Sequence, residues 1–124
     1  MSYIDGIIAP VLAGRKEEFR ATAKESARLF LEYGALQVSD GFGDTEVPEG
    51  KQTDLWRAVA ADKAAGEGIA FGWVVWPSKA VRDEAWGKMM SDARMQPNPD
   101  SPFDMKRMIF GGFESLYDDK DLGR

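Results

Sequence analysis

Two hydrophobic periodicities alternate along this chain, and their order restricts the fold more than any other feature of the sequence. Segments with the composition and alternation of β-strands are predicted at residues 3–12, 35–40, 69–76 and 107–116. Segments in which apolar residues recur every three or four positions are predicted to be helices, at residues 14–33 and from Ser78 through Ala93. The order along the chain is therefore strand, helix, strand, strand, helix, strand.

This order predicts an α+β, ferredoxin-like βαββαβ fold as a single domain over residues 1–117. Right-handed crossovers place the first and third strands at the centre of a four-stranded antiparallel sheet. Both helices cover one face and leave the other bare. Gly34 is the expected glycine after the first helix, and Ser78 the expected N-cap of the second. The remaining segments are predicted to be loops at 41–53 and 96–103, a short helix at 55–61 and a frayed acidic tail at 118–124.

Histidine and cysteine are both absent from the 124 residues. Without imidazole there is no ordinary nucleophile–base triad, and without thiolates there are no disulfides and no sulfur-ligated zinc sites. We therefore expect no cofactor and no metal. The formal net charge of −5 disfavours nucleic acid and anionic membranes as partners, because both are polyanionic surfaces.

The N-terminus and the short apolar runs predict a cytoplasmic protein with no membrane association. Asp5 stands where a signal peptide needs basic residues. The longest apolar run, residues 69–76, falls far short of the roughly 20 residues that span a bilayer. The lack of cysteine also suits a reducing compartment.

Period-two alternation predicts an apolar, aromatic surface on the bare face of the sheet. On the third strand, one alternating set of side chains is small and suits close packing against the helices, so the set with the larger side chains is assigned to the bare face. One of the two alternating sets of the first strand is assigned to the same face. The predicted ligand-binding or dimer face comprises Tyr3, Asp5, Ile7, Phe71, Trp73 and Val75, with Ile4 and Ile8 directed towards the helices. Because such a patch is unusual on a monomer, we expect a second copy of the chain to cover it as a homodimer.

The same face allows an alternative, an RNA-binding module. Residues 70–76 fit part of the third-strand pattern of RNA-recognition motifs, and Tyr3 stands where the partner aromatic would lie. The basic residue that opens the pattern is missing, and the acidic charge opposes phosphate binding. Pairing with a second copy is therefore favoured over RNA.

Three charged residues are the candidates for catalysis: Asp5, Asp104 and Arg107. A desolvated Asp5 would suit a general base, but a structural role is favoured, either as the partner of Arg107 or another strand cation or as a group hydrated at the barrel opening. Asp104, Lys106 and Arg107 would suit an anion-binding rim, but local capping by Asp104 is favoured. Gly111-Gly112 indicates a bulge or a close backbone approach.

The loop before the short helix is rich in acids, and the helix carries a tryptophan. The spacing of the acids fits no calcium loop, so a solvated loop is expected from Asp40, Asp44, Glu46 and Glu49. Trp56 is interpreted either as a lid over one end of the barrel or as a side chain packed beneath the loop.

Several short motifs occur together in one order. They are Tyr3–Gly6, Glu32–Ala35, Val47–Lys51, Phe71–Trp73, Trp76–Lys79, Pro102–Asp104, Lys106–Ile109 and Gly111–Glu114. On these motifs the chain resembles, over nearly its full length, the YbaA-like family of uncharacterised bacterial proteins (domain of unknown function 1428). The resemblance implies the dimeric α/β-barrel variant of the ferredoxin-like fold, and no established activity. Proteins of similar barrel shape include cofactor-free oxygenases and muconolactone isomerase-like enzymes.

The leading hypothesis is a homodimeric barrel-forming domain whose interior holds a small hydrophobic or aromatic molecule. A cofactor-free oxygenase or isomerase, using Asp5 and a rim group, is the alternative, and RNA binding is the third. The sequence does not decide whether the protein is an enzyme.

Overall fold

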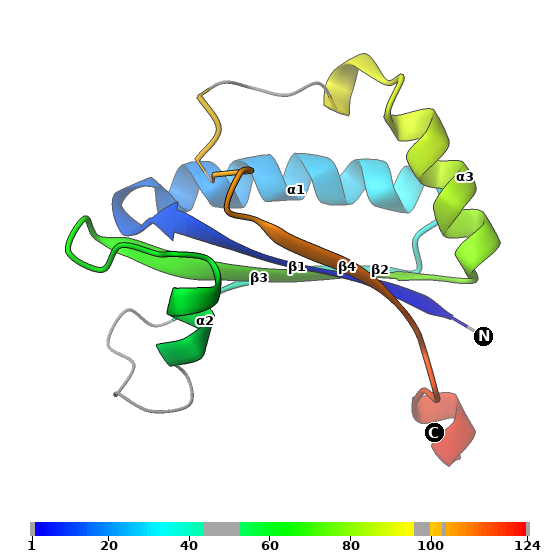
Figure 1. Cartoon of the computed structure of the whole chain (residues 1–124). Helices are drawn as coiled ribbons and strands as arrows, with labels where there is room; N and C mark the ends of the chain where they lie inside the picture. Colours follow the sequence, from blue (N-terminus) through cyan, green and yellow to red (C-terminus); the bar gives the residue numbers. More distant parts are fainter. Residues whose placement is uncertain (1, 44–52, 96–99, 103, 124) are drawn as a thin grey trace.

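The computed structural model describes residues 2–43, 53–95, 100–102 and 104–123. Its strands form one antiparallel sheet in the order β2-β3-β1-β4, so the first and third strands are central, as predicted. The strands are β1 (Tyr3–Leu12), β2 (Gln37–Phe42), β3 (Glu67–Trp76) and β4 (Ile109–Glu114). Figure 1 shows the sheet edge-on.

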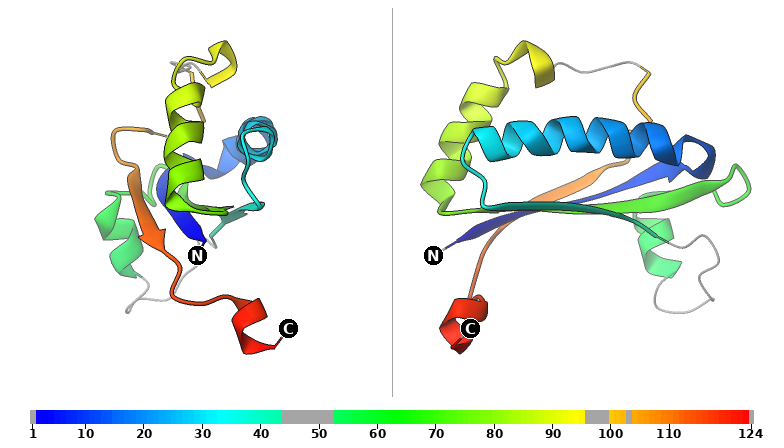
Figure 2. Two further views of the ribbon diagram at one scale, coloured as in Figure 1. Left: turned by 90° about the vertical axis from the view of Figure 1, so that its right-hand side faces the viewer. Right: turned by 180° about the vertical axis from the view of Figure 1, so that it is seen from behind.

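Two helices lie on one side of the sheet, which we call the helix face. They are α1 (Lys16–Glu32), which follows a 3₁₀ turn at Ala13–Arg15, and α3 (Lys79–Met89). The other side of the sheet, which we call the far face, was predicted to be bare but is partly covered. α2 (Thr53–Ala58) and a C-terminal 3₁₀ helix (Asp119–Leu122) lie on that side (Figures 1 and 2). Within the described residues, no helix is long and apolar enough to cross a bilayer.

The helix ends follow the local signals in the sequence. Gly34 has a φ of 112°, the left-handed conformation expected just after α1. The Ser78 hydroxyl accepts a hydrogen bond from the Val81 amide at 3.1 Å, which caps α3 as predicted. The C-terminal 3₁₀ helix has a capping box between Asp118 and Asp121, and it lies within the acidic segment that is predicted to fray.

Strand boundaries depart from prediction where tertiary contacts extend pairing. β2 begins and ends two residues later than predicted, and at its end Phe42 pairs with Ala70 and lays its ring over Gly68. β4 is shorter than expected, and its pairing with β1 continues without a bulge through Gly111 and Gly112. The glycines instead make room for aromatic rings. A Cβ on Gly112 would lie 2.6 Å from the Tyr3 hydroxyl oxygen.

The main hydrophobic core lies between the helix face and α3. Trp76 is fully buried there, and Ala85 and Met89 of α3 pack in the same cluster. Phe30 of α1 meets Trp76 edge-on, with ring centroids 6.2 Å apart. The apolar stripe of each long helix therefore faces the sheet, which is the arrangement that its periodicity predicts.

A second core covers one end of the far face. Trp56 and Val59, from α2 and the turn after it, pack with Ile69, and Ile8 joins them. Lys63 lies over the Trp56 ring, 4.7 Å from its centroid. Trp56 therefore packs against the sheet, and the loop that was predicted to cover it lies largely outside the described residues.

The prediction of which β1 side chains lie on the bare face of the sheet is wrong. Tyr3 lies opposite Trp76 and Asp5 opposite Val74, and directly opposite residues in a sheet point to the same side. Tyr3, Asp5 and Ile7 therefore lie on the helix face, whereas Ile4 and Ile8 lie on the far face. Alternation separates a strand into two sets but does not say which set faces the helices, and the buried Asp5 carboxylate has its partners on the helix side.

Phe71, Trp73 and Val75 of β3 lie on the far face, as predicted. Phe71 is 47% exposed, and its ring centroid lies 5.7 Å from that of Trp73. Because Tyr3 is on the opposite side of the sheet, it does not stack beside them as the RNA-binding alternative requires.

A salt-bridge network joins the start of β3 to the turn before β4. The Arg107 guanidinium donates to both Glu67 carboxylate oxygens, at 2.7 and 2.6 Å, and to Asp104 at 2.8 Å. Asp104 also accepts from the Lys106 amide, which is the local capping favoured above. Arg107 therefore pairs with Glu67 and Asp104, and the expected pairing with Asp5 is wrong. The Arg107 guanidinium lowers the pKa of the Glu67 carboxyl from its ordinary value near 4.5.

Acid should weaken this network. Because the folded state lowers the pKa of Glu67, its contribution to stability is present above the ordinary pKa and is lost as the pH falls through the lowered one. We expect Glu67→Gln to lose less unfolding free energy than wild type from about pH 6 to about pH 3 in urea titrations. Glu114→Gln, which removes an exposed carboxyl, serves as control. Parallel pH profiles for wild type and Glu67→Gln would contradict this role.

Candidate functional site

A cavity of about 650 Å³ lies between the helix face of the sheet and the helices α1 and α3. Its walls are largely apolar and include four aromatic side chains that stand on the helix side: Phe19, Phe30, Trp86 and Phe110. The polar side chains among its described lining residues are Asp5, Thr22, Ser26 and Asp40. This is the size and character of a site for a small organic molecule.

Small side chains make the space. Ala9, Ala70 and Gly72 form part of the floor, and Ala23 and Ser26 of α1 line the opposite wall. The small residues of β3 were predicted to allow close helix packing. They instead leave part of the sheet uncovered by side chains, so that α1 passes over an open volume.

Methionines concentrate around the cavity. Five contribute to the lining: Met89, Met90, Met95, Met105 and Met108. Met90 and Met105 are largely exposed, whereas Met89 is buried. Flexible thioether side chains adapt to ligands of different shapes, so the lining suits apolar molecules without demanding one outline.

A buried carboxylate closes one end of the cavity. Asp5 is 2% exposed, and its Oδ2 accepts hydrogen bonds from the indole N–H groups of Trp76 and Trp86, both at 2.9 Å. Arg82 of α3 donates through Nε at 3.0 Å and through Nη2 at 2.9 Å. These donors occupy both carboxylate oxygens. The geometry gives Asp5 a structural role and leaves no evident lone pair for a general base.

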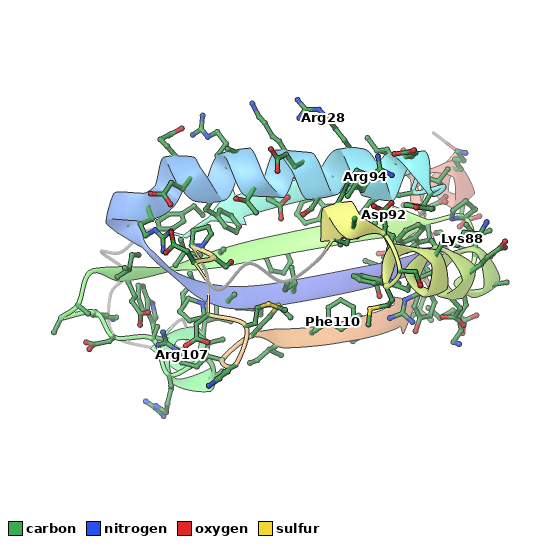
Figure 3. All side chains as sticks on the ribbon, turned by 90° about the horizontal axis from the view of Figure 1, so that it is seen from above. Arg28, Lys88, Asp92, Arg94, Arg107 and Phe110 are labelled. Atoms are coloured by element: carbon green, nitrogen blue, oxygen red, sulfur yellow. The ribbon has the colours of Figure 1, made fainter. Side chains whose placement is uncertain are left out.

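Aromatic rings enclose the cation of this cluster. The Arg82 guanidinium lies 5.4 Å from the Tyr3 ring centroid and 5.9 Å from that of Phe110. Phe110, labelled on β4 in Figure 3, also meets Trp86 edge-on at 5.9 Å. The Asp5 carboxylate raises the pKa of Arg82, so the guanidinium stays charged.

A polar network fixes the chain after α3. The Tyr33 hydroxyl donates to Asp92 at 2.7 Å, and Arg94 donates to Asp92 at 2.7 Å and to Glu32 at 3.0 Å. Figure 3 shows Asp92 and Arg94 near the C-terminal end of α1. These contacts hold the 3₁₀ turn at Ala93–Met95 against α1, and thereby place Met95 at the cavity.

Asp40 is the cavity residue that the sequence analysis missed. It was assigned to an acidic solvated loop, but it lies on β2 opposite Gly72, and its carboxylate extends over that glycine. Asp40 is an exposed residue, yet desolvation by the groups around its carboxyl raises the pKa of that carboxyl. Among the described residues, no hydrogen bond or ion pair reaches it. The available signal was the alternation of β2, which puts Asp40 and Val38 on one face.

Asp40 also borders a second, smaller cavity of about 350 Å³ between α1 and β2, which is lined by cations of α1: Lys16, Arg20 and Lys24. The three other acids of the predicted loop, Asp44, Glu46 and Glu49, lie outside the described residues, as does most of the loop at 96–103. Within the described residues, no three acidic side chains gather as a metal site.

The other two catalytic candidates lie away from Asp5. Arg107 lies at the end of the sheet opposite α3 (Figure 3). Neither Asp104 nor Arg107 is among the described residues that line the main cavity. Asp104 and Arg107 pair with each other, and Arg107 also pairs with Glu67, so both side chains are engaged in structural contacts.

The order of the strands and the placement of the helices define the class: a ferredoxin-like βαββαβ fold with a four-stranded antiparallel sheet. A solved structure supports this class. The chain is similar to a mutant form of SnoaB from Streptomyces nogalater, which is described as a cofactor-independent oxygenase. The TM-score is 0.55 with 11% sequence identity, over 94% of this chain and 95% of SnoaB. At this identity the likeness concerns the fold alone.

The chain belongs to the family described as "Protein of unknown function (DUF1428)", whose profile matches residues 2–105. The uncharacterized protein YbaA of Escherichia coli K12 is 47% identical over 120 residues, which are 96% of this chain and 100% of YbaA. YbaA of Shigella flexneri matches to the same extent. The resemblance inferred from the motifs is thus confirmed.

Removing the Asp5 charge should destabilise the fold. Asp5→Asn leaves the Arg82 guanidinium without its carboxylate in a mostly buried site, and breaking such a pair costs about 3 kcal/mol. We expect this loss of unfolding free energy in urea denaturation, with Asp83→Asn, which alters an exposed neighbour of Arg82, as control. A stability loss equal to that of the control would show that the buried cluster is dispensable.

Proposed function

We propose that this protein is a homodimeric domain that binds a small apolar, aromatic molecule in the main cavity. The observation that carries the proposal is the cavity of about 650 Å³ with largely apolar walls. Its volume lies within the range of roughly 300–1,000 Å³ that is typical of small-molecule sites. Met90 and Met105, which contribute to the lining, are largely exposed, so the cavity is open to solvent and accessible to a ligand.

The walls favour a flat ring system. Phe30 and Trp86 lie with ring centroids 5.6 Å apart, and Trp86 meets Phe110 edge-on, so a continuous aromatic surface borders the cavity. Aromatic pairs in these geometries gain energy beyond area burial. The methionines around the cavity add polarizable contacts to a ring edge.

Filling the cavity should abolish binding. Ser26→Phe puts a ring into the space from α1, and we expect the affinity for 2-methylnaphthalene to fall at least about tenfold in calorimetric titration, because the added side chain takes the ligand's volume. Ala21→Phe, on the exposed side of the same helix, is the matched control and should bind as wild type does.

Circular dichroism should show that both variants fold. Equal affinities for 2-methylnaphthalene in wild type and Ser26→Phe would place binding elsewhere on the molecule. No measurable binding by wild type would count against the proposed ligand class.

The far face supports the homodimer. Phe71 and Phe113 are 47% and 61% exposed there, Ile109 is also exposed, and Trp73 and Val75 are half-buried. α2 covers only the end of this face that contains Ile8 and Ile69. An exposed apolar patch of this composition is typical of an interface. A second copy offers a self-complementary surface, because two-fold pairing brings the same patch of each subunit together.

A charge on the far face should separate the subunits. Wild type is expected to sediment as a dimer at micromolar concentration, and Phe71→Glu as a monomer, because the carboxylate would be desolvated in the interface. Leu31→Glu, an exposed apolar position on α1, should remain a dimer. A monomeric wild type would refute the homodimer, and a dimeric Phe71→Glu variant would place the interface elsewhere.

The second candidate is a cofactor-independent oxygenase. The fold likeness to SnoaB favours it, together with the carboxylate of Asp40 in the apolar cavity, which no hydrogen bond or ion pair reaches among the described residues and which would serve as a proton acceptor. Asp5, Asp104 and Arg107 are engaged in structural contacts, so Asp40 suits this role better. Oxygen uptake in the presence of a hydroxylated aromatic compound would distinguish an oxygenase from a binding protein.

A further inference from the structure

We propose that Asp40 is the recognition group of the main cavity, and that the ligand is a neutral aromatic molecule with a hydroxyl group that donates to this carboxylate. The inference rests on the proposed function, since it concerns the same cavity. It adds the chemical class of the ligand and the residue that selects it.

The first support is how the chain makes room for the carboxylate. A Cβ on Gly72 would collide with Asp40 Oδ1 and would lie 3.1 Å from Ile7 Cγ2. The Asp40 carboxylate therefore lies against the floor of the cavity, beside Ile7, in space that only a glycine at position 72 leaves free. Phe71 and Trp73, on either side of Gly72 in β3, point to the far face, so this single position creates the niche.

The second support is the balance of charge in the cavity. Among its described lining residues are two acids, Asp5 and Asp40, and Arg82 neutralises Asp5 at one end. Among the described lining residues of this cavity there is no lysine or arginine, so no cation of the cavity itself pairs with the exposed Asp40 carboxylate. A carboxylate in that setting attracts hydrogen-bond donors and repels anionic ligands. The lysines and arginine of α1 line the smaller cavity on the other side of Asp40.

The third support comes from desolvation. An ammonium group costs much more to transfer into an apolar cavity than a hydroxyl group does. The hydroxyls of Thr22 and Ser26, on α1, add polar contacts without charge. A neutral hydroxyl on an aromatic ring therefore matches the lining better than a charged amine.

The experiment compares two ligands of nearly equal shape, 2-naphthol and 2-methylnaphthalene, by isothermal titration calorimetry on the full chain. We expect wild type to bind 2-naphthol about tenfold more tightly, the contribution of a hydrogen bond to a charged acceptor. In Asp40→Leu this preference should vanish while 2-methylnaphthalene binds at least as well as before. Gly72→Ala should weaken the preference too, because the added methyl group displaces the carboxylate. Glu25→Leu, which removes an exposed acid on α1, should keep the wild-type preference.

The two ligands separate the two proposals. Binding of 2-methylnaphthalene reports on the apolar cavity, and the ratio of the two affinities reports on Asp40. If wild type binds both ligands equally, or if Asp40→Leu keeps the preference for 2-naphthol, the recognition role is refuted while cavity binding stands. If neither ligand binds, both proposals fall.

Discussion

The buried carboxylate of Asp5 is the interaction on which the arrangement of β1, β3 and α3 depends. It accepts from Trp76, Trp86 and Arg82, which follow it by 71, 81 and 77 residues, so one side chain joins the N-terminal strand to the second half of the chain. An ionised group in the interior is tolerated only when its lone pairs are satisfied, and here two indoles and a guanidinium satisfy them. The phase of β1 follows from this, because turning Asp5 to the far face would take the shared acceptor away from all three donor side chains.

The sequence allowed the topology to be predicted, because it depends on local signals. Alternation along the strand predicted β1 with its observed bounds. Helix-end signals predicted the left-handed Gly34 and the Ser78 cap. Each of these features depends on a few neighbouring residues. The site was largely beyond such reasoning. The phase of β1 depends on partners distant in the sequence, and the role of Asp40 depends on its position opposite a glycine in another strand. A residue whose role depends on its contact with another strand cannot be recognised from the sequence of either strand alone.

Family and fold provide different information here. Nearly half of the aligned residues are identical in YbaA, and that relation assigns the chain to a family without a known activity. The relation to SnoaB covers the fold at 11% identity, too distant to transfer residues or chemistry. What can be argued about function therefore comes from the cavity itself. The small residues of its floor, its aromatic walls and the Asp40 carboxylate are features of this chain's own structure. Each of them can be tested by substitution.

The open volume beneath α1 has a consequence for hydration. The cavity of about 650 Å³ is bordered by exposed side chains such as Met90 and Met105, so solvent reaches its largely apolar walls. An apolar occupant would release that water, and the burial of apolar surface gives a negative change in heat capacity. The heat capacity of binding would then distinguish a molecule held in this cavity from one held on the charged surface.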